Sequence, residues 1–84
     1  LCFSDPHRPY TPGGVPNPHD PARLTLPPFY PDTPLVRQDY AAYYDEIARF
    51  DADVGTILEE LRRRGLDGNT LVAVSGDNGA AQFR

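Results

Sequence analysis

The sequence contains no lysine, methionine or tryptophan, and only one cysteine, Cys2. A single cysteine cannot form an internal disulfide, so a small disulfide-stabilised fold is excluded. All eight basic residues are arginine and twelve residues are acidic, which gives a net charge of −4. This charge argues against a general nucleic-acid binder, which needs a basic stripe. No stretch is long and apolar enough to predict a membrane span.

The chain is also short of apolar residues for its size. It has 84 residues, of which 39% are hydrophobic. A domain of about 60–80 residues buries only about 60% of its unfolded surface and is usually marginally stable. The sequence begins inside an apolar run, Leu1-Cys2-Phe3, and stops at Arg84 without a terminating feature. We therefore expect residues 1–84 to be an internal fragment of one larger domain.

Proline divides the chain into two parts. All ten prolines lie between Pro6 and Pro34. Proline lacks a backbone donor and is excluded from helix interiors, and it pushes the preceding residue into an extended conformation. Residues 5–34 are therefore predicted to be an irregular loop, and its aromatic residues indicate that it packs on the rest of the chain. These aromatics are Tyr10, Phe29 and Tyr30.

A single long helix is predicted over residues 35–64. Apolar residues recur there in steps of three and four, which places them on one helical face. They are Val36, Tyr40, Tyr43, Ile47, Phe50, Val54, Ile57, Leu58 and Leu61. Thr33 is a suitable amino-terminal cap, Pro34 suits the first helical position, and Gly65 suits the carboxyl-terminal stop. A helix of this length would extend for about 45 Å.

Two buried strands are expected on either side of the loop and helix. Residues 70–75 contain a continuous apolar run between turn residues, as in a strand of a parallel sheet that is covered on both faces. Residues 1–4 resemble the end of a similar strand. The order strand, long Pro-rich loop, long helix, strand predicts a right-handed βαβ unit and an α/β fold class.

Polar residues follow each expected strand. The first strand leads into DPHR, residues 5–8, and the second into GDNG, within an active-site loop predicted over residues 76–84. Ligands of parallel α/β sheets bind outside the carboxyl ends of the strands. If the two strands are parallel in one sheet, both clusters lie at the same edge and form a candidate site.

Each residue of this candidate site also has a simpler interpretation. Asp77 and Asn78 precede Gly79 and are compatible with a plain turn, but two adjacent oxygen donors also suit a hard cation such as Ca²⁺. His7 is either a surface histidine or a group that donates to an anionic oxygen or transfers a proton. Arg8 either clamps an oxyanion through two hydrogen bonds or only solvates the loop.

Other reactive or charged residues have mainly structural interpretations. Cys2 is predicted to pack as an inert hydrophobe, because no basic neighbour or helix start would lower its pKa. His19 is interpreted as a loop residue, Asp53 as part of a solvated face, and Asp51 as a structural residue paired with a buried donor. The arginines at 62–64 favour the carboxyl-terminal end of the helix dipole.

Taken together, these segments resemble a known family. FSDPHRPY, followed by LPPFYPDTPLVRQDYAAYYDEIARFDADVGTILEELRRRGLDGNTLVAVSGDNG, is similar to the sulfatases of the alkaline-phosphatase superfamily. The similarity covers nearly the whole chain and is nearest to the sulfamidase-like, or heparan N-sulfatase-like, branch. It implies that the chain is part of an alkaline-phosphatase-like doubly wound sheet sandwich. It also implies an enzyme that hydrolyses sulfate esters or N-sulfates of a sulfated sugar.

The resemblance assigns roles to three residues. It implies that Asp77 and Asn78 are Ca²⁺ ligands and that His7 contacts the sulfate or leaving group in catalysis. Arg8, whose guanidinium can clamp an oxyanion, is predicted to bind substrate. The family's formylglycine nucleophile, made from Cys or Ser in Cys/Ser-x-Pro-x-Arg, has no counterpart here, since the residues after Cys2 do not fit the motif. The isolated fragment is therefore expected to be inactive.

Some alternatives remain open at this point. The resemblance implies a periplasmic, secreted or lysosomal location and leaves the oligomeric state unknown. A phosphodiesterase or phosphonate hydrolase of the same superfamily is one alternative, although Asn78 favours calcium over a transition metal. A non-enzymatic helical interaction module is the other, because the apolar spacing of the helix is heptad-like.

Overall fold

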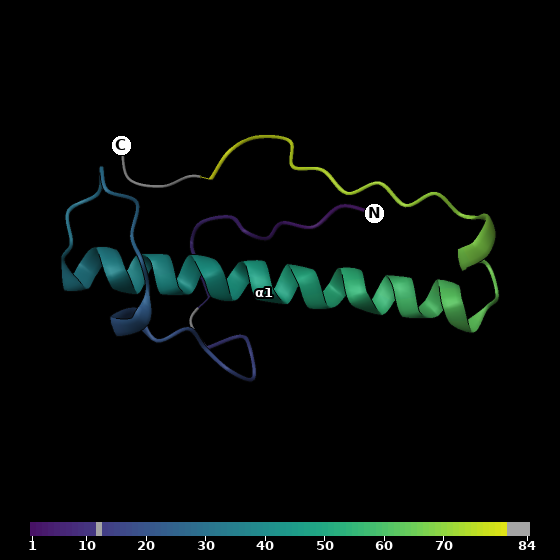
Figure 1. Cartoon of the computed structure of the whole chain (residues 1–84), viewed down its shortest axis with the longest axis horizontal. Coiled ribbons are helices and arrows are strands. Elements are labelled where there is room, and N and C mark those ends of the chain that lie inside the picture. Colours follow the sequence, from purple (N-terminus) through teal and green to yellow (C-terminus); the bar gives the residue numbers. More distant parts are fainter. Residues whose placement is uncertain (12, 81–84) are drawn as a thin grey trace.

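The structure is a computed structural model that describes residues 1–11 and 13–80. In the described chain, two short 3-10 helices, η1 (Pro21–Arg23) and η2 (Asp67–Asn69), flank one long α-helix, α1 (Pro34–Arg63). Residues before α1 fold back against its first half, and residues after η2 return along its length (Figure 1). The molecule is elongated, with extents of 48 × 27 × 21 Å.

Both ends of α1 are capped by the residues that the sequence indicates. The Thr33 hydroxyl accepts a hydrogen bond from the Val36 backbone at 3.3 Å, and Pro34 occupies the first turn. At the other end, Gly65 has a φ of 66°, which a glycine adopts at little cost. The Gly65 amide donates to the Arg62 carbonyl and the Leu66 amide to the Leu61 carbonyl, as in a Schellman motif. α1 is therefore shifted by one residue from the expected 35–64.

A small core lies between the loop and the first half of α1. Val36, Tyr40 and Ala41 are the buried apolar residues of the described chain. Aromatic rings from the loop pack on this part of the helix: Tyr30 lies 5.4 Å from Tyr40, and Tyr10 lies 5.8 Å from Tyr43, measured between ring centroids. These contacts explain how a segment with so many prolines takes a defined path.

The second half of α1 is far less covered. Leu58 is 43% exposed, and no residue of α1 after Glu46 is buried. Charged residues alternate with the apolar ones, and exposed ion pairs such as Arg62–Glu59 line its surface. None of the helices among the described residues combines the length and apolar character needed to cross a membrane.

Neither expected strand forms in the described part of the chain. Residues 1–4 and 70–75 have no strand assignment, and Leu71 is 96% exposed. The amino-terminal segment and the segment after η2 nevertheless run in the same direction, opposite to α1 (Figure 1). A strand exists only when its backbone groups pair with a neighbour, and these segments have none here. The α/β sheet sandwich is thus not shown, and Cys2 is exposed, not packed in a core as expected.

Candidate functional site

The backbone around His7 is held by a buried carboxylate of α1. Glu46 is 1% exposed. Its Oε2 accepts a hydrogen bond from the His7 backbone amide at 3.2 Å, and its Oε1 accepts one from the Thr11 backbone amide at 2.7 Å. Buried carboxylates are costly unless hydrogen bonds satisfy them. One side chain therefore fixes the loop on both sides of Arg8-Pro9-Tyr10.

An arginine links this carboxylate to the start of the loop. Arg49 Nε donates to Asp5 Oδ2 at 2.6 Å, and its Nη2 donates to Glu46 Oε1 at 3.2 Å. The hydrogen bond to Asp5 is the largest of the effects that raise the pKa of Arg49. The negative charge of Glu46 is thus balanced by a partner that itself holds the loop.

Arg8 forms a bidentate ion pair with Asp39 of α1. Its Nη1 and Nη2 lie 2.9 and 2.5 Å from the two carboxylate oxygens of Asp39. The guanidinium also lies 4.6 Å above the Tyr10 ring, and the hydrogen bond to Asp39 raises the pKa of Arg8. The planar fork that would suit an oxyanion is engaged by the protein's own carboxylate. The geometry gives Arg8 a structural contact, and its predicted contact with substrate stays a prediction.

His7 is exposed and directly precedes Arg8, which forms this ion pair. Its Nδ1 lies 2.6 Å from the Arg8 carbonyl oxygen. A carbonyl oxygen can only accept, so Nδ1 carries the proton of this hydrogen bond. In the neutral ring, Nε2 then has the lone pair and is the nitrogen able to receive a proton. This arrangement suits the acid–base or anion-contacting role expected of His7.

Asp77 and Asn78 lie in an exposed bend after the 70–75 segment. A Cβ built on Gly76 would lie 3.4 Å from the Asn78 carbonyl oxygen, so the chain folds back closely at this point. No group of three or more His, Cys, Asp or Glu residues that could hold a metal is present in residues 1–11 and 13–80. The two side chains supply only part of a calcium shell, which takes 6–8 oxygens.

The described contacts do not unite the four predicted site residues. His7 and Arg8 are joined to α1, whereas Asp77 and Asn78 lie in the exposed bend that follows the 70–75 segment. Part of the predicted loop over 76–84, including Arg84, lies outside the described residues. The shared edge expected for the two clusters is therefore not tested by this chain.

His19, interpreted from the sequence as a loop residue, pairs with a second buried carboxylate of α1, Asp45. Both the backbone amide and Nδ1 of His19 lie 2.8 Å from Asp45 Oδ1. Asp45 is 4% exposed, and the His19 ring lies 5.6 Å from Tyr44. Asp51, by contrast, is exposed, so the buried pairing expected for it is wrong.

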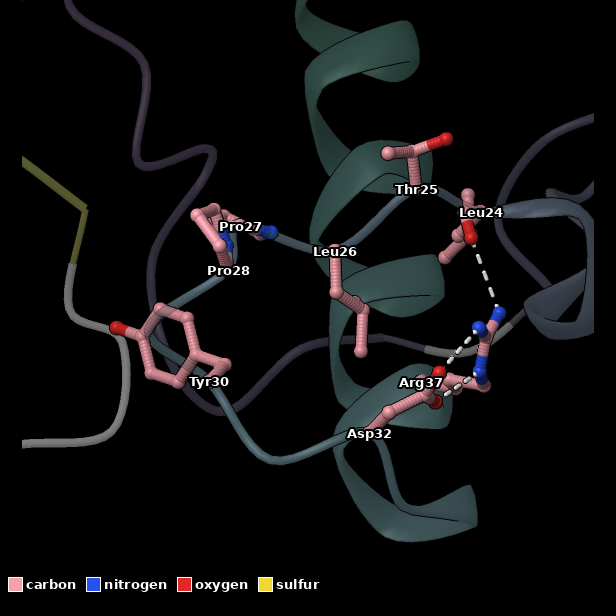
Figure 2. A pocket seen from close by; sticks show the side chains of 8 residues that line it. All are labelled: Leu24, Thr25, Leu26, Pro27, Pro28, Tyr30, Asp32 and Arg37. Atoms are coloured by element: carbon pink, nitrogen blue, oxygen red, sulfur yellow. Dashed lines mark hydrogen bonds and ion pairs between the residues drawn. The ribbon is translucent and has the colours of Figure 1, made fainter.

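A pocket lies between the loop and the start of α1. Residues 24–28, Tyr30, Asp32 and Arg37 line it (Figure 2). Arg37 pairs with both carboxylate oxygens of Asp32, at 2.5 and 2.8 Å, and donates to the backbone carbonyls of Pro21 and Leu24 at 2.9 and 3.0 Å. The hydrogen bond to Asp32 raises the pKa of Arg37. The arginine closes the loop, so we assign this pocket a structural role.

Sequence reasoning missed the three carboxylates that organise the loop. Asp39, Asp45 and Glu46 look like members of a solvated helix face. The available signal was spacing: Asp39, Glu46 and Arg49 are separated by seven and three residues and so share one side of the helix. Only the path of the loop reveals that this side is covered.

Comparison with known proteins identifies relatives over most of the chain. A family model described as Sulfatase matches residues 1–83. A human N-sulphoglucosamine sulphohydrolase is 43% identical over 68 residues, which are 81% of this chain and 14% of that protein. An ulvan-active sulfatase of Formosa agariphila is 37% identical over 57 residues, 68% of this chain and 10% of that protein.

A third relative supports the same family. An arylsulfatase of Klebsiella aerogenes is 48% identical over 48 residues, covering 57% of this chain and 10% of that protein. No solved structure gives a significant match. The chain spans between a tenth and a seventh of the length of these relatives. Because the family model covers both polar clusters and the helix between them, the chain belongs to the sulfatase family.

Proposed function

We propose that this chain is one segment of the catalytic domain of a longer sulfatase, which hydrolyses sulfate esters or N-sulfates of a sulfated sugar. The observation that carries the proposal is the family match over residues 1–83, which contains DPHR and GDNG in the expected order. The human relative, named as a sulphohydrolase of N-sulphoglucosamine, favours an N-sulfate. The two other relatives are named as sulfatases and leave a sulfate ester open.

His7 is the catalytic group that this chain contributes. Its backbone is fixed by Glu46, and the hydrogen bond between Nδ1 and the Arg8 carbonyl leaves Nε2 as the nitrogen that exchanges protons. A positioned histidine of this kind contributes about 10²–10⁴-fold to a rate when it protonates the leaving oxygen or nitrogen. Arg8 is proposed to add positive charge near the sulfate while its ion pair with Asp39 holds the loop.

Asp77 and Asn78 are the proposed calcium ligands. Both offer hard oxygen donors on an exposed bend, which fits Ca²⁺ and not a thiophilic metal. Two residues cannot complete the shell, so the remaining ligands are proposed to come from other parts of the longer protein. When bound, the cation would stabilise negative charge on the sulfate oxygens.

The nucleophile is proposed to lie outside this chain, as a formylglycine made from a Cys or Ser. The isolated 84 residues are accordingly expected to show no turnover. A periplasmic, secreted or lysosomal location is proposed for the whole enzyme on the basis of the family. A detected sulfatase activity of the isolated chain would contradict this division of the site.

The experiment is an assay of the longer protein, produced together with a formylglycine-generating enzyme. Purified protein would be offered 4-methylumbelliferyl sulfate, N-sulfated glucosamine and bis-p-nitrophenyl phosphate in parallel. We expect turnover of at least one sulfate substrate, and loss of about 10²–10⁴-fold in His7→Ala. His19→Ala is the matched control, because it lies in the same loop on a different carboxylate.

Two results would overturn the proposal. Turnover of the phosphodiester alone would favour a phosphodiesterase of the same superfamily. Absence of all three activities, together with a discrete oligomer assembled through α1, would favour a non-enzymatic interaction module.

A further inference from the structure

The Glu46 carboxylate has a position that the proposed chemistry does not explain. A glutamate is rarely fully buried unless it is paired, yet Glu46 is the least exposed charged residue in the described chain. It lies in the middle of an amphipathic helix where an apolar side chain would satisfy packing alone. The three groups that satisfy it are the amides of His7 and Thr11 and the guanidinium of Arg49.

These partners all bear on one short segment. The two amides flank residues 8–10, and Arg49 continues from Glu46 to Asp5, two residues before His7. The segment from 5 to 11 is thus held at both ends by one connected set of charges. Two further groups on α1, Asp39 and Tyr43, hold its middle through Arg8 and Tyr10.

The hydrogen bond that Glu46 accepts from His7 comes from the backbone amide and not from the ring. It restrains the His7 backbone while the residue stays exposed. A carboxylate suits this task because it has only acceptors and can receive several N–H groups at once. A glutamine of the same shape would present an NH₂ group to one of these amides, which cannot accept a hydrogen bond.

We propose that Glu46 is a positioning residue for catalysis: its buried carboxylate, fixed by Arg49, sets the backbone of His7 so that the imidazole meets the substrate in a productive geometry. This inference rests on the proposed role of His7. A displacement of about 1 Å at a catalytic group can reduce a rate by about 100-fold. The contribution of Glu46 should therefore appear in kcat and not only in stability.

The neighbouring residue provides a matched control. Asp45 is buried to nearly the same degree and accepts two hydrogen bonds from the same loop, but its partner is His19. Asp45→Asn and Glu46→Gln each remove one buried negative charge from adjacent helix positions. A purely structural role would make the two variants alike in activity as well as in melting temperature.

The test is a double-mutant cycle in the longer sulfatase, with Glu46→Gln, His7→Ala and both together. We expect Glu46→Gln to lower kcat by about 10–100-fold with KM changed less, and Asp45→Asn to leave kcat within about 2-fold while lowering Tm similarly. Because the two residues act as one unit, Glu46→Gln should cost less than about 2-fold further on the His7→Ala background. Circular dichroism and Tm of each variant establish that it is folded.

The outcomes separate this inference from the proposed function. If His7→Ala retains full activity, the role proposed for His7 is wrong and the positioning role falls with it. If His7→Ala is impaired but Glu46→Gln is as active as the parent, the positioning role alone is wrong. The same holds if Glu46→Gln lowers kcat by the same factor in the parent and in the His7→Ala variant. If Glu46→Gln does not fold, Arg49→Lys, which keeps the charge but loses the double contact, is tested for the same non-additive loss.

Discussion

Apolar residues recur along both halves of α1, but the two halves have different surroundings. Residues 34–50 face a loop that supplies aromatic rings, two carboxylate-bound backbone segments and three ion pairs. Residues 51–63 face mostly solvent and hold together through exposed local pairs. Surface pairs of this kind contribute about 0–1 kcal/mol each.

The difference shows which part of the chain is structurally complete. The first half has its own small core, and its buried charges are satisfied by partners within the chain. The second half and the segment after η2 expose Leu58, Leu71, Val72 and Val74. Exposed apolar side chains of this kind are the ones that the rest of the proposed longer domain would cover.

The largest effect is expected from a core substitution in the first half. Tyr40 is 5% exposed and packs edge-on against Tyr30. Truncation of a large buried aromatic residue costs about 3–5 kcal/mol, so Tyr40→Ala should abolish most of the helical circular dichroism of the 84-residue chain. Leu58→Ala should change it little.

The same two variants in the longer protein test whether the second half of α1 is covered there. There, Leu58→Ala should destabilise by about 2–5 kcal/mol if the rest of the domain buries Leu58, as measured by urea unfolding. An equally small effect in both contexts would show that the second half remains uncovered.

The next largest effect is expected from Asp77, which with Asn78 is a predicted Ca²⁺ ligand and lies after α1 and η2 in the chain. Asp77→Asn removes a charged oxygen ligand, and loss of several kcal/mol of charge stabilisation corresponds to about 10²–10³-fold in kcat. Added Ca²⁺ should recover part of this loss if affinity is what was weakened. Asp67→Asn, an exposed residue in η2, is the control. Equal activity of Asp77→Asn and the parent at low Ca²⁺ would remove Asp77 from the site.

Alkaline pH should act on the first half selectively. Burial, and then the hydrogen bond with Tyr30, raise the pKa of Tyr40 to about 12. In the unfolded chain its pKa is about 10, so above that pH the unfolded state releases the proton more readily than the folded state. The stabilisation is complete below about pH 10 and is lost as the pH rises towards 12.

Urea unfolding of the longer protein between pH 9 and 12 measures this loss. Tyr40→Phe keeps the ring but not the titrating hydroxyl, so its stability should fall less steeply over the same range. Identical slopes for the two proteins would show that the Tyr40 hydroxyl is not responsible.

The smallest effect compares the two halves through their polar contacts. Thr33→Ala removes the amino-terminal cap of α1 and should cost about 1 kcal/mol. Glu59→Gln removes an exposed ion pair with Arg62 and should cost about 0.5 kcal/mol or less. Thermal unfolding of both variants tests the order, and a larger cost for Glu59→Gln would reverse it.

The sequence was sufficient for features that depend on local chemistry. Periodicity and the caps at Thr33 and Gly65 define α1 to within one residue at each end. The DPHR and GDNG segments identify the family without knowledge of the fold. Such features need only neighbouring residues to act, which is why a single sequence contains them.

Features that depend on distant partners could not be predicted in the same way. Burial of Glu46 depends on the path of residues 5–11, more than thirty positions earlier, and a glutamate on a helix ordinarily indicates a solvated face. Residues 1–4 and 70–75 are predicted to be strands from local composition, but a strand forms only with a paired neighbour, and neither segment is a strand in the described part of the chain. The exposure of Cys2 has the same cause.

A crystal structure of the proposed longer sulfatase with Ca²⁺ and a bound sulfate would show whether His7, Asp77 and Asn78 share one site. We expect Asp77 and Asn78 to coordinate the cation, and His7, still held by Glu46, to contact a sulfate on that cation. A structure that places His7 and Asp77 at opposite edges of the sheet would contradict the shared site.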